Sequence, residues 1–270
     1  MDAAERELFA SALVGAVDGA ADVDAALAGL GWDDALADDP RVAVSVLFEW
    51  KGRALAASSA LHTVMGTVVL PVLGTTAPPE GRGLALRAPP GHDARPVLGL
   101  DPTLGLFEVS GSFTAGDPAA WHDAVAAGQR ALAHELIGAS SAMLDLARDH
   151  ALERIQFGVP IASFQAVRHK LADSLVAVES ARGALDAAWG AGTPFDAAVA
   201  KAIAGRSARL VAKHAQQVLA GIGFTMEHPL HRYVRRVRVL DGLLGDARTL
   251  TRELGEHLLR ERGLPAILPL

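Results

Sequence analysis

The sequence predicts a mainly α protein in three parts: an N-terminal helical region (residues 1–73), a short β and loop segment (74–116) and a C-terminal four-helix bundle (117–270). Half of the 270 residues are hydrophobic, yet only 5% are aromatic. A core made mainly of Ala and Leu favours helices, because neither residue loses much rotamer freedom there. Proline and glycine are frequent in the middle segment, and helical periodicity is strong after it.

The N-terminal region reads as several helices between residues 5 and 70, with breaks around Gly31 and Pro40. Within it, the nearly uncharged run Ala54–Leu73 approaches the length of a membrane span. Because this run contains histidine, serine and threonine and ends at a proline, a buried helix is the favoured interpretation. We therefore expect no membrane association.

Three short apolar runs in the middle segment predict brief β-strands. They are LALRA (84–88), PVLGL (96–100) and LFEVSGSF (106–113), and turns rich in proline and glycine separate them. The segment is too short for a β-sandwich or a barrel, so we expect only a small β patch.

Four helical stretches follow, each with its own start and stop signals. An N-cap with proline at the first helical position opens two of them. Their expected limits are Asp117-Pro118 to about Glu153, Val159-Pro160 to Gly192, Thr193-Pro194 to Gly221, and a last region, interrupted around 242–245, with Leu250, Leu254 and Leu258 on one side. Long helices with short connections indicate an antiparallel bundle.

Composition and charge exclude several classes of function. The formal net charge of −6 argues against a nucleic-acid-binding protein, which normally presents a basic field. Without cysteine there is no disulfide, thiolate metal site or thiol nucleophile. His228 and His231 lack a third ligand of suitable spacing, so no metal site is expected. The first residues, MDAAERELFA, carry acids where an export signal needs cations, which predicts a cytoplasmic protein.

The sharpest local feature is the stretch Glu153–Ile161 (ERIQFGVPI), between two predicted helices. Arg154 offers a planar fork of donors suited to phosphate oxygens, and Phe157 offers a ring for stacking. The amino end of the next helix would add free N–H groups and a positive dipole. These residues predict a platform for a pyrophosphate and a ring. The alternative is that Arg154 caps the first helix and Phe157 fills the core.

Two further stretches could contact a ligand. Gly221 and Gly223 allow tight turning and close backbone approach, although a helix C-cap is the alternative. Without a preceding strand, this G-x-G is not a dinucleotide-binding fingerprint. The run His231–Arg238 (HRYVRRVR) is the densest basic cluster in the chain. It could hold a phosphate-rich ligand or an acidic neighbouring subunit, or it could be a solvated helix face.

Together these stretches resemble the helical domain of the flavin-dependent acyl-CoA dehydrogenases, from about Trp121 to Leu259. The resemblance rests on the order and spacing of ERIQFGVPI at 153–161, FQAVRHKLAD at 164–173, and Gln217 to Phe224 followed by EHPLH at 227–231. The last motif is most similar to that of actinobacterial dehydrogenases that shorten steroid side chains.

The resemblance implies an FAD site that is shared across a subunit boundary. Arg154 would pair with the FAD pyrophosphate of a neighbouring subunit, and Phe157 would pack beside that cofactor. Gln156 and Ile161 would line the cofactor, while Gln217 and Gly221 would contact its adenosine end.

Departures from the family pattern change the expected role. The reaction needs a carboxylate to remove the proton α to the thioester while the β-hydride passes to the flavin. Where the family usually has this glutamate, the chain reads Leu244-Gly245-Asp246, and the alternative family position falls near Gly128. The β domain that covers the flavin in the family is also much reduced. We therefore expect no catalytic residue in this chain.

Resemblance and departures together predict one subunit of a hetero-oligomer, expected as α2β2, that dehydrogenates an acyl-CoA. A homologous acyl-CoA dehydrogenase subunit would hold most of the FAD and supply the base, and a steroid-derived acyl-CoA is one candidate substrate. Two alternatives stay open. The chain could be a self-sufficient homodimeric flavoenzyme with its base relocated to Asp241 or Asp246, or a non-catalytic structural subunit.

Overall fold

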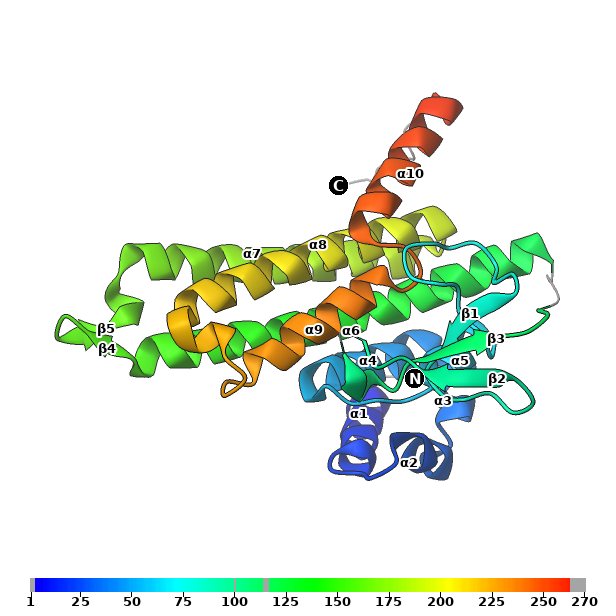
Figure 1. Ribbon diagram of the computed structural model, residues 1–270, viewed down its shortest axis with the longest axis horizontal. Coiled ribbons are helices and arrows are strands. Elements are labelled where there is room, and N and C mark those ends of the chain that lie inside the picture. Colours follow the sequence, from blue (N-terminus) through cyan, green and yellow to red (C-terminus); the bar gives the residue numbers. More distant parts are fainter. Residues whose placement is uncertain (1–2, 100, 114–116, 263–270) are drawn as a thin grey trace.

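The structure is a computed structural model that describes residues 3–99, 101–113 and 117–262. Within these residues the protein is mainly α, as predicted: a group of N-terminal helices and a small sheet lie against a long helical bundle (Figure 1). The expected boundary between the middle segment and the bundle falls at residues 114–116, outside the described residues.

The N-terminal helices are α1 (Ala3–Val17), α2 (Val23–Leu30), α3 (Trp32–Asp38), α4 (Pro40–Ala54) and α5 (Ala60–Met65). Two of their breaks fall where the sequence predicts, around Gly31 and Pro40. Gly31 takes a left-handed φ of 74° between α2 and α3. Asp39 caps α4 by accepting a hydrogen bond of 3.1 Å from Val42 N.

The prediction of one buried helix over Ala54–Leu73 is wrong, because only Ala54, the last residue of α4, and the six residues of α5 are helical there. Leu55 and Gly66 take left-handed conformations that end α4 and α5. Beyond Gly66 the chain meets the sheet, where Leu70 and Leu84 exchange backbone hydrogen bonds of 2.7 and 2.8 Å. No helix among residues 3–99, 101–113 and 117–262 is long and apolar enough to cross a membrane.

The middle segment forms a three-stranded antiparallel sheet in the order β1-β3-β2. Strands β1 (Arg82–Ala85) and β3 (Phe107–Ser110) overlap the predicted runs, but β2 (Asp93–Pro96) ends where the predicted strand PVLGL begins. Leu100, the last residue of that run, lies outside the described residues. Strand β2 is an exposed edge in which two of the four residues, Asp93 and Arg95, are charged, so an apolar pattern does not reveal it. A short 3₁₀ turn, η1 (Pro102–Leu104), precedes β3.

The bundle consists of α6 (Pro118–Glu153), α7 (Gln165–Ala191), α8 (Pro194–Leu219) and α9 (Leu230–Gly242), and α10 (Ala247–Glu261) projects from it (Figure 1). Asp117 and Thr193 cap α6 and α8 as predicted, and Gly192 ends α7 with a φ of 72°. The start of α7 differs from the prediction. A two-stranded hairpin, β4 (Ile155–Gln156) and β5 (Val159–Pro160), and the turn η2 (Ile161–Ser163) precede it.

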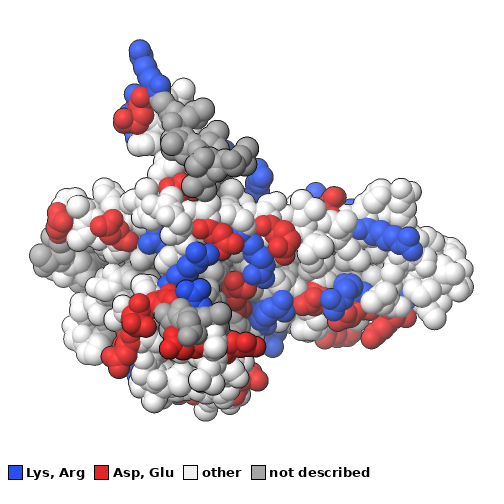
Figure 2. All heavy atoms as spheres, turned by 180° about the vertical axis from the view of Figure 1, so that it is seen from behind, with Lys and Arg blue, Asp and Glu red and all other residues white. Residues whose placement is uncertain are grey.

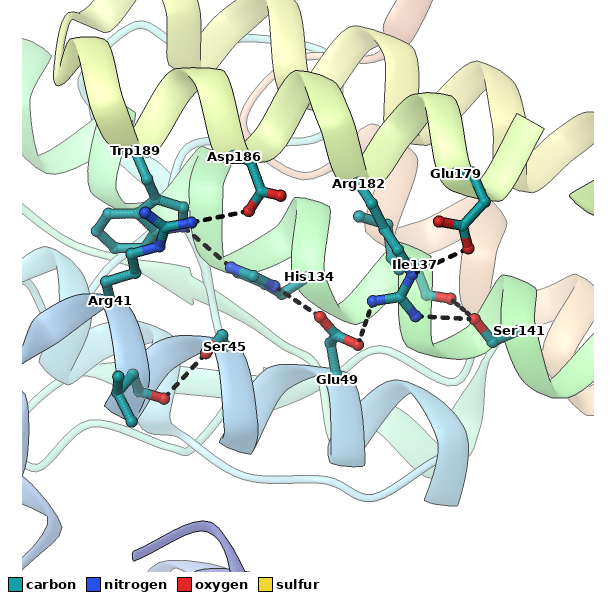
Figure 3. Close-up of polar contacts among 11 residues, drawn as sticks. Arg41, Ser45, Glu49, His134, Ile137, Ser141, Glu179, Arg182, Asp186 and Trp189 are labelled. Carbon is teal, nitrogen blue, oxygen red and sulfur yellow. Dashed lines mark hydrogen bonds and ion pairs between the residues drawn. The ribbon is translucent and has the colours of Figure 1, made fainter. Parts of the chain in front are cut away.

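A polar seam joins the N-terminal helix α4 to α6 and α7 (Figure 3). Trp189 Nε1 donates to His134 Nε2 (3.0 Å), and His134 Nδ1 contacts the Glu49 carboxylate at 3.1 Å. Arg182 reaches the other oxygen of that carboxylate at 2.9 Å. Where α4 and α6 cross, their backbones touch: a Cβ added to Gly138 would overlap the carbonyl oxygen of Glu49. The N-terminal helices and the bundle therefore share one core.

Candidate functional site

The hairpin between α6 and α7 places Phe157 in solvent. Phe157 and Gly158 form its two-residue loop, both with positive φ (53° and 80°), as in type I′ turns. The Phe157 side chain is 94% exposed and meets the Phe164 ring edge to face, with centroids 6.1 Å apart. The alternative that Phe157 fills the core is therefore wrong. A bulky residue in this backbone conformation is uncommon, and here the turn holds the ring out of the core.

Arg154 lies at the base of the hairpin. Its backbone N–H donates to His150 O (2.9 Å) at the end of α6, and its carbonyl accepts from Ile161 N (2.8 Å). The backbone thus caps the helix, while the side chain is exposed. Its guanidinium forms no ion pair with any residue that the structure describes. Arg154 is left with its full set of donors.

The other predicted cofactor contacts lie at the same end of the bundle. Gln156 is exposed and its Nε2 donates to Ile155 O (2.7 Å), whereas Ile161 is half-buried against the core. Gln217 is exposed on the last turn of α8. Gly221 is exposed in the following 3₁₀ turn, η3 (Ala220–Phe224), and a Cβ there would meet nothing within 4 Å. In the described part of the chain, no hydrogen bond links Gln217 or Gly221 to the hairpin.

Exposed apolar side chains gather at this end of the bundle. They come from the end of α6, the hairpin, the first half of α7 and the loop around η3. Figure 2, which views the molecule from behind, shows the tip of the bundle as largely uncharged. Contiguous exposed apolar surface usually marks an interaction site. The residues are Leu152, Ile155, Phe157, Val159, Phe164, Leu175, Val176, Ile222, Phe224 and Met226.

The two family positions for a catalytic base face each other in the core. Leu244 is fully buried, and a Cβ added to Gly128 would lie 2.5 Å from Leu244 Cδ1 and 2.7 Å from Met65 Sδ. Gln129 Nε2 holds the Leu244 carbonyl at 3.0 Å. Leu244 and Met65 therefore form an apolar plug, which fills the space that either carboxylate would occupy. Met65 also lines a cavity of about 450 Å³ between the sheet and the start of α6, together with Val69, Phe113 and Trp121.

The candidate replacement carboxylates have structural partners. Asp241 is buried, accepts from Ala247 N (3.1 Å) and pairs with Arg209 (3.2 Å). Asp246 caps α10 and accepts from the backbones of Arg248 and Thr249. Burial raises the pKa of Asp246, but the hydrogen bonds from Thr249 and Arg248 outweigh it and hold that pKa below its usual value. Both carboxylates thus take part in contacts that hold the fold.

Lys201 is a residue that the sequence reasoning missed. It is fully buried on α8, and its Nζ donates to Asp241 O (2.9 Å) and Gly245 O (3.2 Å). Burial lowers its pKa to about 8. The lysine fixes the loop in which the family's glutamate would stand. In the sequence, the single sign that this lysine is buried is its position on the alanine-rich face of a helix.

Within residues 3–99, 101–113 and 117–262, no group of three or more His, Asp or Glu side chains could hold a metal ion.

The fold and this site define a helical domain that displays an arginine and a ring at one end. Residues 124–259 match the family model described as the acyl-CoA dehydrogenase C-terminal domain, which is half of the chain. The chain belongs to the acyl-CoA dehydrogenase family.

More particularly, the chain is similar to mycobacterial members of the family. It is 36% identical over 164 residues to acyl-CoA dehydrogenase IpdE2 of Mycobacterium tuberculosis, covering 60% of this chain and 50% of that protein. It is 46% identical over 121 residues to acyl-CoA dehydrogenase FadE34 of the same organism, covering 42% and 17%. The chain spans about half the length of the first of these relatives.

Two solved structures share the fold over nearly the whole chain. One is the ChsE4-ChsE5 complex from Mycobacterium tuberculosis, with a TM-score of 0.74 at 20% identity, covering 98% of this chain and 99% of that chain. The other is the Tcur3481-Tcur3483 steroid ACAD variant, with a TM-score of 0.70 at 24% identity, covering 95% and 88%. The predicted fold class is confirmed, including the small middle segment.

Proposed function

We propose that this chain is the non-base-bearing subunit of a hetero-oligomeric, FAD-dependent acyl-CoA dehydrogenase. One observation carries the proposal: Arg154 and Phe157 stand free at one end of the bundle, while both positions for a base are closed by an apolar plug. These two side chains can contact a cofactor, but no carboxylate stands at either position to remove the proton that starts the reaction.

The exposed residues fit the cofactor by their chemistry. The Arg154 guanidinium would bind the FAD pyrophosphate through charge-assisted hydrogen bonds, and the Phe157 ring would pack beside the cofactor. Gln156 and Ile161 would line it, and Gln217 and the open backbone at Gly221 would receive its adenosine end. The flavin, when bound, supplies the hydride acceptor for α,β-dehydrogenation.

The proposed partner is a homologous, full-length acyl-CoA dehydrogenase subunit in an α2β2 assembly in the cytoplasm. That subunit would hold most of the FAD and the acyl-CoA and would supply the glutamate base. Two structural neighbours, the ChsE4-ChsE5 complex and the Tcur3481-Tcur3483 steroid ACAD variant, support a heteromeric enzyme and a steroid-derived substrate. The apolar end of the bundle would be buried against the partner.

Co-expression with an adjacent-gene homologue tests the proposal. We expect the two chains to copurify with FAD, and this chain alone to be colourless. Arg154→Ala should lower the affinity of the assembly for FAD by about tenfold or more, because it removes charge-assisted hydrogen bonds. Arg148→Ala is the matched control, since Arg148 lies in α6 shortly before Arg154 but pairs with Asp145 and Asp149.

Three results would contradict the proposal. Tight yellow FAD binding by the isolated chain would favour the homodimeric enzyme. Turnover by the isolated chain that Asp246→Asn abolishes would favour a relocated base. If Arg154→Ala left the flavin content and turnover of the assembly unchanged, a purely structural subunit would be favoured.

A further inference from the structure

The basic run of α9 is divided between two environments. Arg236 points into the core, where it is fully buried, pairs with Asp101 and donates to Ala56 O at 2.9 Å. Arg238 is exposed and faces the neighbouring helix α8. The run is therefore neither one solvated face nor one ligand site, and Arg238 requires its own explanation.

Arg238 lines a groove of about 510 Å³ between α8 and α9, two helices that lie side by side (Figure 1). The floor of the groove is apolar, made by Ala212, Val234 and Val237. A volume of this size is typical of small-molecule sites, which combine an apolar lining with a few polar groups.

The charges around this groove do not balance. Among the described residues that line it, Asp241 is the one carboxylate, and it already pairs with Arg209 at 3.2 Å and accepts from Ala247 N. Lys213 on α8 and Arg238 on α9 remain, one on each helix, and neither forms an ion pair with any part of the chain that the structure describes. The groove thus presents two unpaired cations above an apolar floor.

We propose that this groove binds a small organic phosphate monoester, of the class of a nucleoside monophosphate. The phosphate would bridge Lys213 and Arg238, the apolar floor would receive the organic group, and the Gln216 amide would supply a further donor and acceptor. The lining residues of α8 run from Arg209 to Gln216, about 10 Å of helix, which suits a compact anion better than an extended acidic segment. This inference goes beyond the proposed flavin role, and either can fail without the other.

Titration calorimetry of the full chain with AMP, adenosine and inorganic phosphate tests it. We expect AMP to bind at one site. Adenosine should bind at least about tenfold more weakly, because it lacks the charged phosphate. Inorganic phosphate should also bind more weakly than AMP, because it has no organic group to cover the apolar floor. Lys213→Gln and Arg238→Gln should each weaken AMP binding by about tenfold. Arg232→Gln is the matched control, because Arg232 is exposed on the same helix but does not line the groove. Unchanged circular dichroism melting would confirm that each variant is folded.

Several results would overturn the inference. They are the absence of AMP binding, equal binding of AMP and adenosine, equal binding of AMP and phosphate, and an Arg232→Gln effect as large as that of Arg238→Gln. If the Lys213→Gln and Arg238→Gln variants instead failed to assemble with the partner subunit while AMP bound to neither form, the groove would be a protein interface. The phosphate site would then be rejected.

Discussion

Side chains are packed tightly where α4 crosses α6, and they are exposed at the hairpin end of the bundle. At the crossing, glycine backbones touch, and the polar groups of Trp189, His134, Glu49 and Arg182 satisfy one another (Figure 3). At the hairpin, Phe157 is 94% exposed among other apolar side chains. The chain packs tightly where its own helices meet. Its exposed end therefore does not reflect a poor core, and it suits contacts that the chain does not complete by itself.

The largest effect is expected from filling the contact between α4 and α6. In Gly138→Ala, the new Cβ would overlap the Glu49 carbonyl oxygen, and backbone cannot rotate away as a side chain can. We expect the free energy of unfolding to fall by about 3 kcal/mol, at the upper end for an overpacked core. Thermal and urea unfolding of the full chain measure it.

Gly183→Ala is the control for that substitution. Gly183 lies within α7, and a Cβ there would meet nothing within 4 Å. Because alanine favours helix over glycine, this variant should be more stable than the wild type by about 0.5–1 kcal/mol. Equal effects at the two glycines would show that the crossing is looser than described.

A smaller, pH-dependent effect is expected in the polar seam. Burial raises the pKa of Glu49, but His134 and Arg182 outweigh it and hold that pKa below its usual 4.5. The unfolded chain therefore binds the proton more readily, so the stabilisation is complete above about pH 4.5 and is lost as the pH falls below it. Glu49→Gln should remove about 1–2 kcal/mol at pH 7 and less at pH 3.5. Urea unfolding at both pH values checks this, and a difference that grows on acidification would contradict it.

The smallest effect is expected at the hairpin. Phe157→Asn replaces a bulky residue of positive φ by the one that type I′ turns prefer before glycine. The isolated chain should keep its stability or gain about 0.5 kcal/mol, while copurification with the partner subunit weakens. A clear loss of stability in the isolated chain would mean that the Phe157 ring serves this chain's own fold.

The helix ends were predictable because their signals are local. Asp117-Pro118, Thr193-Pro194 and Gly192 each fix a boundary through groups within one turn of the chain. The run Ala54–Leu73 misled because apolar character reports burial and does not distinguish a helix from an extended segment. The edge strand β2 was missed because two of its four residues, Asp93 and Arg95, are charged.

The residues of the candidate site could be predicted from the sequence, but their surroundings could not. The motif around Arg154 and Phe157 implied contact with something outside the chain, and both side chains are exposed. The contact of Leu244 with Gly128 and the burial of Lys201 arise from distant segments brought together by the fold. No local pattern encodes them. Whether the six predicted residues bind FAD stays a prediction.

The contact between Leu244 and Gly128 links two positions that lie far apart in the sequence. A glutamate introduced at either position alone would place an uncompensated negative charge in an apolar space that is already filled. Engineering a base into this chain would therefore require at least two coordinated substitutions, one for the carboxylate and one to make room for it.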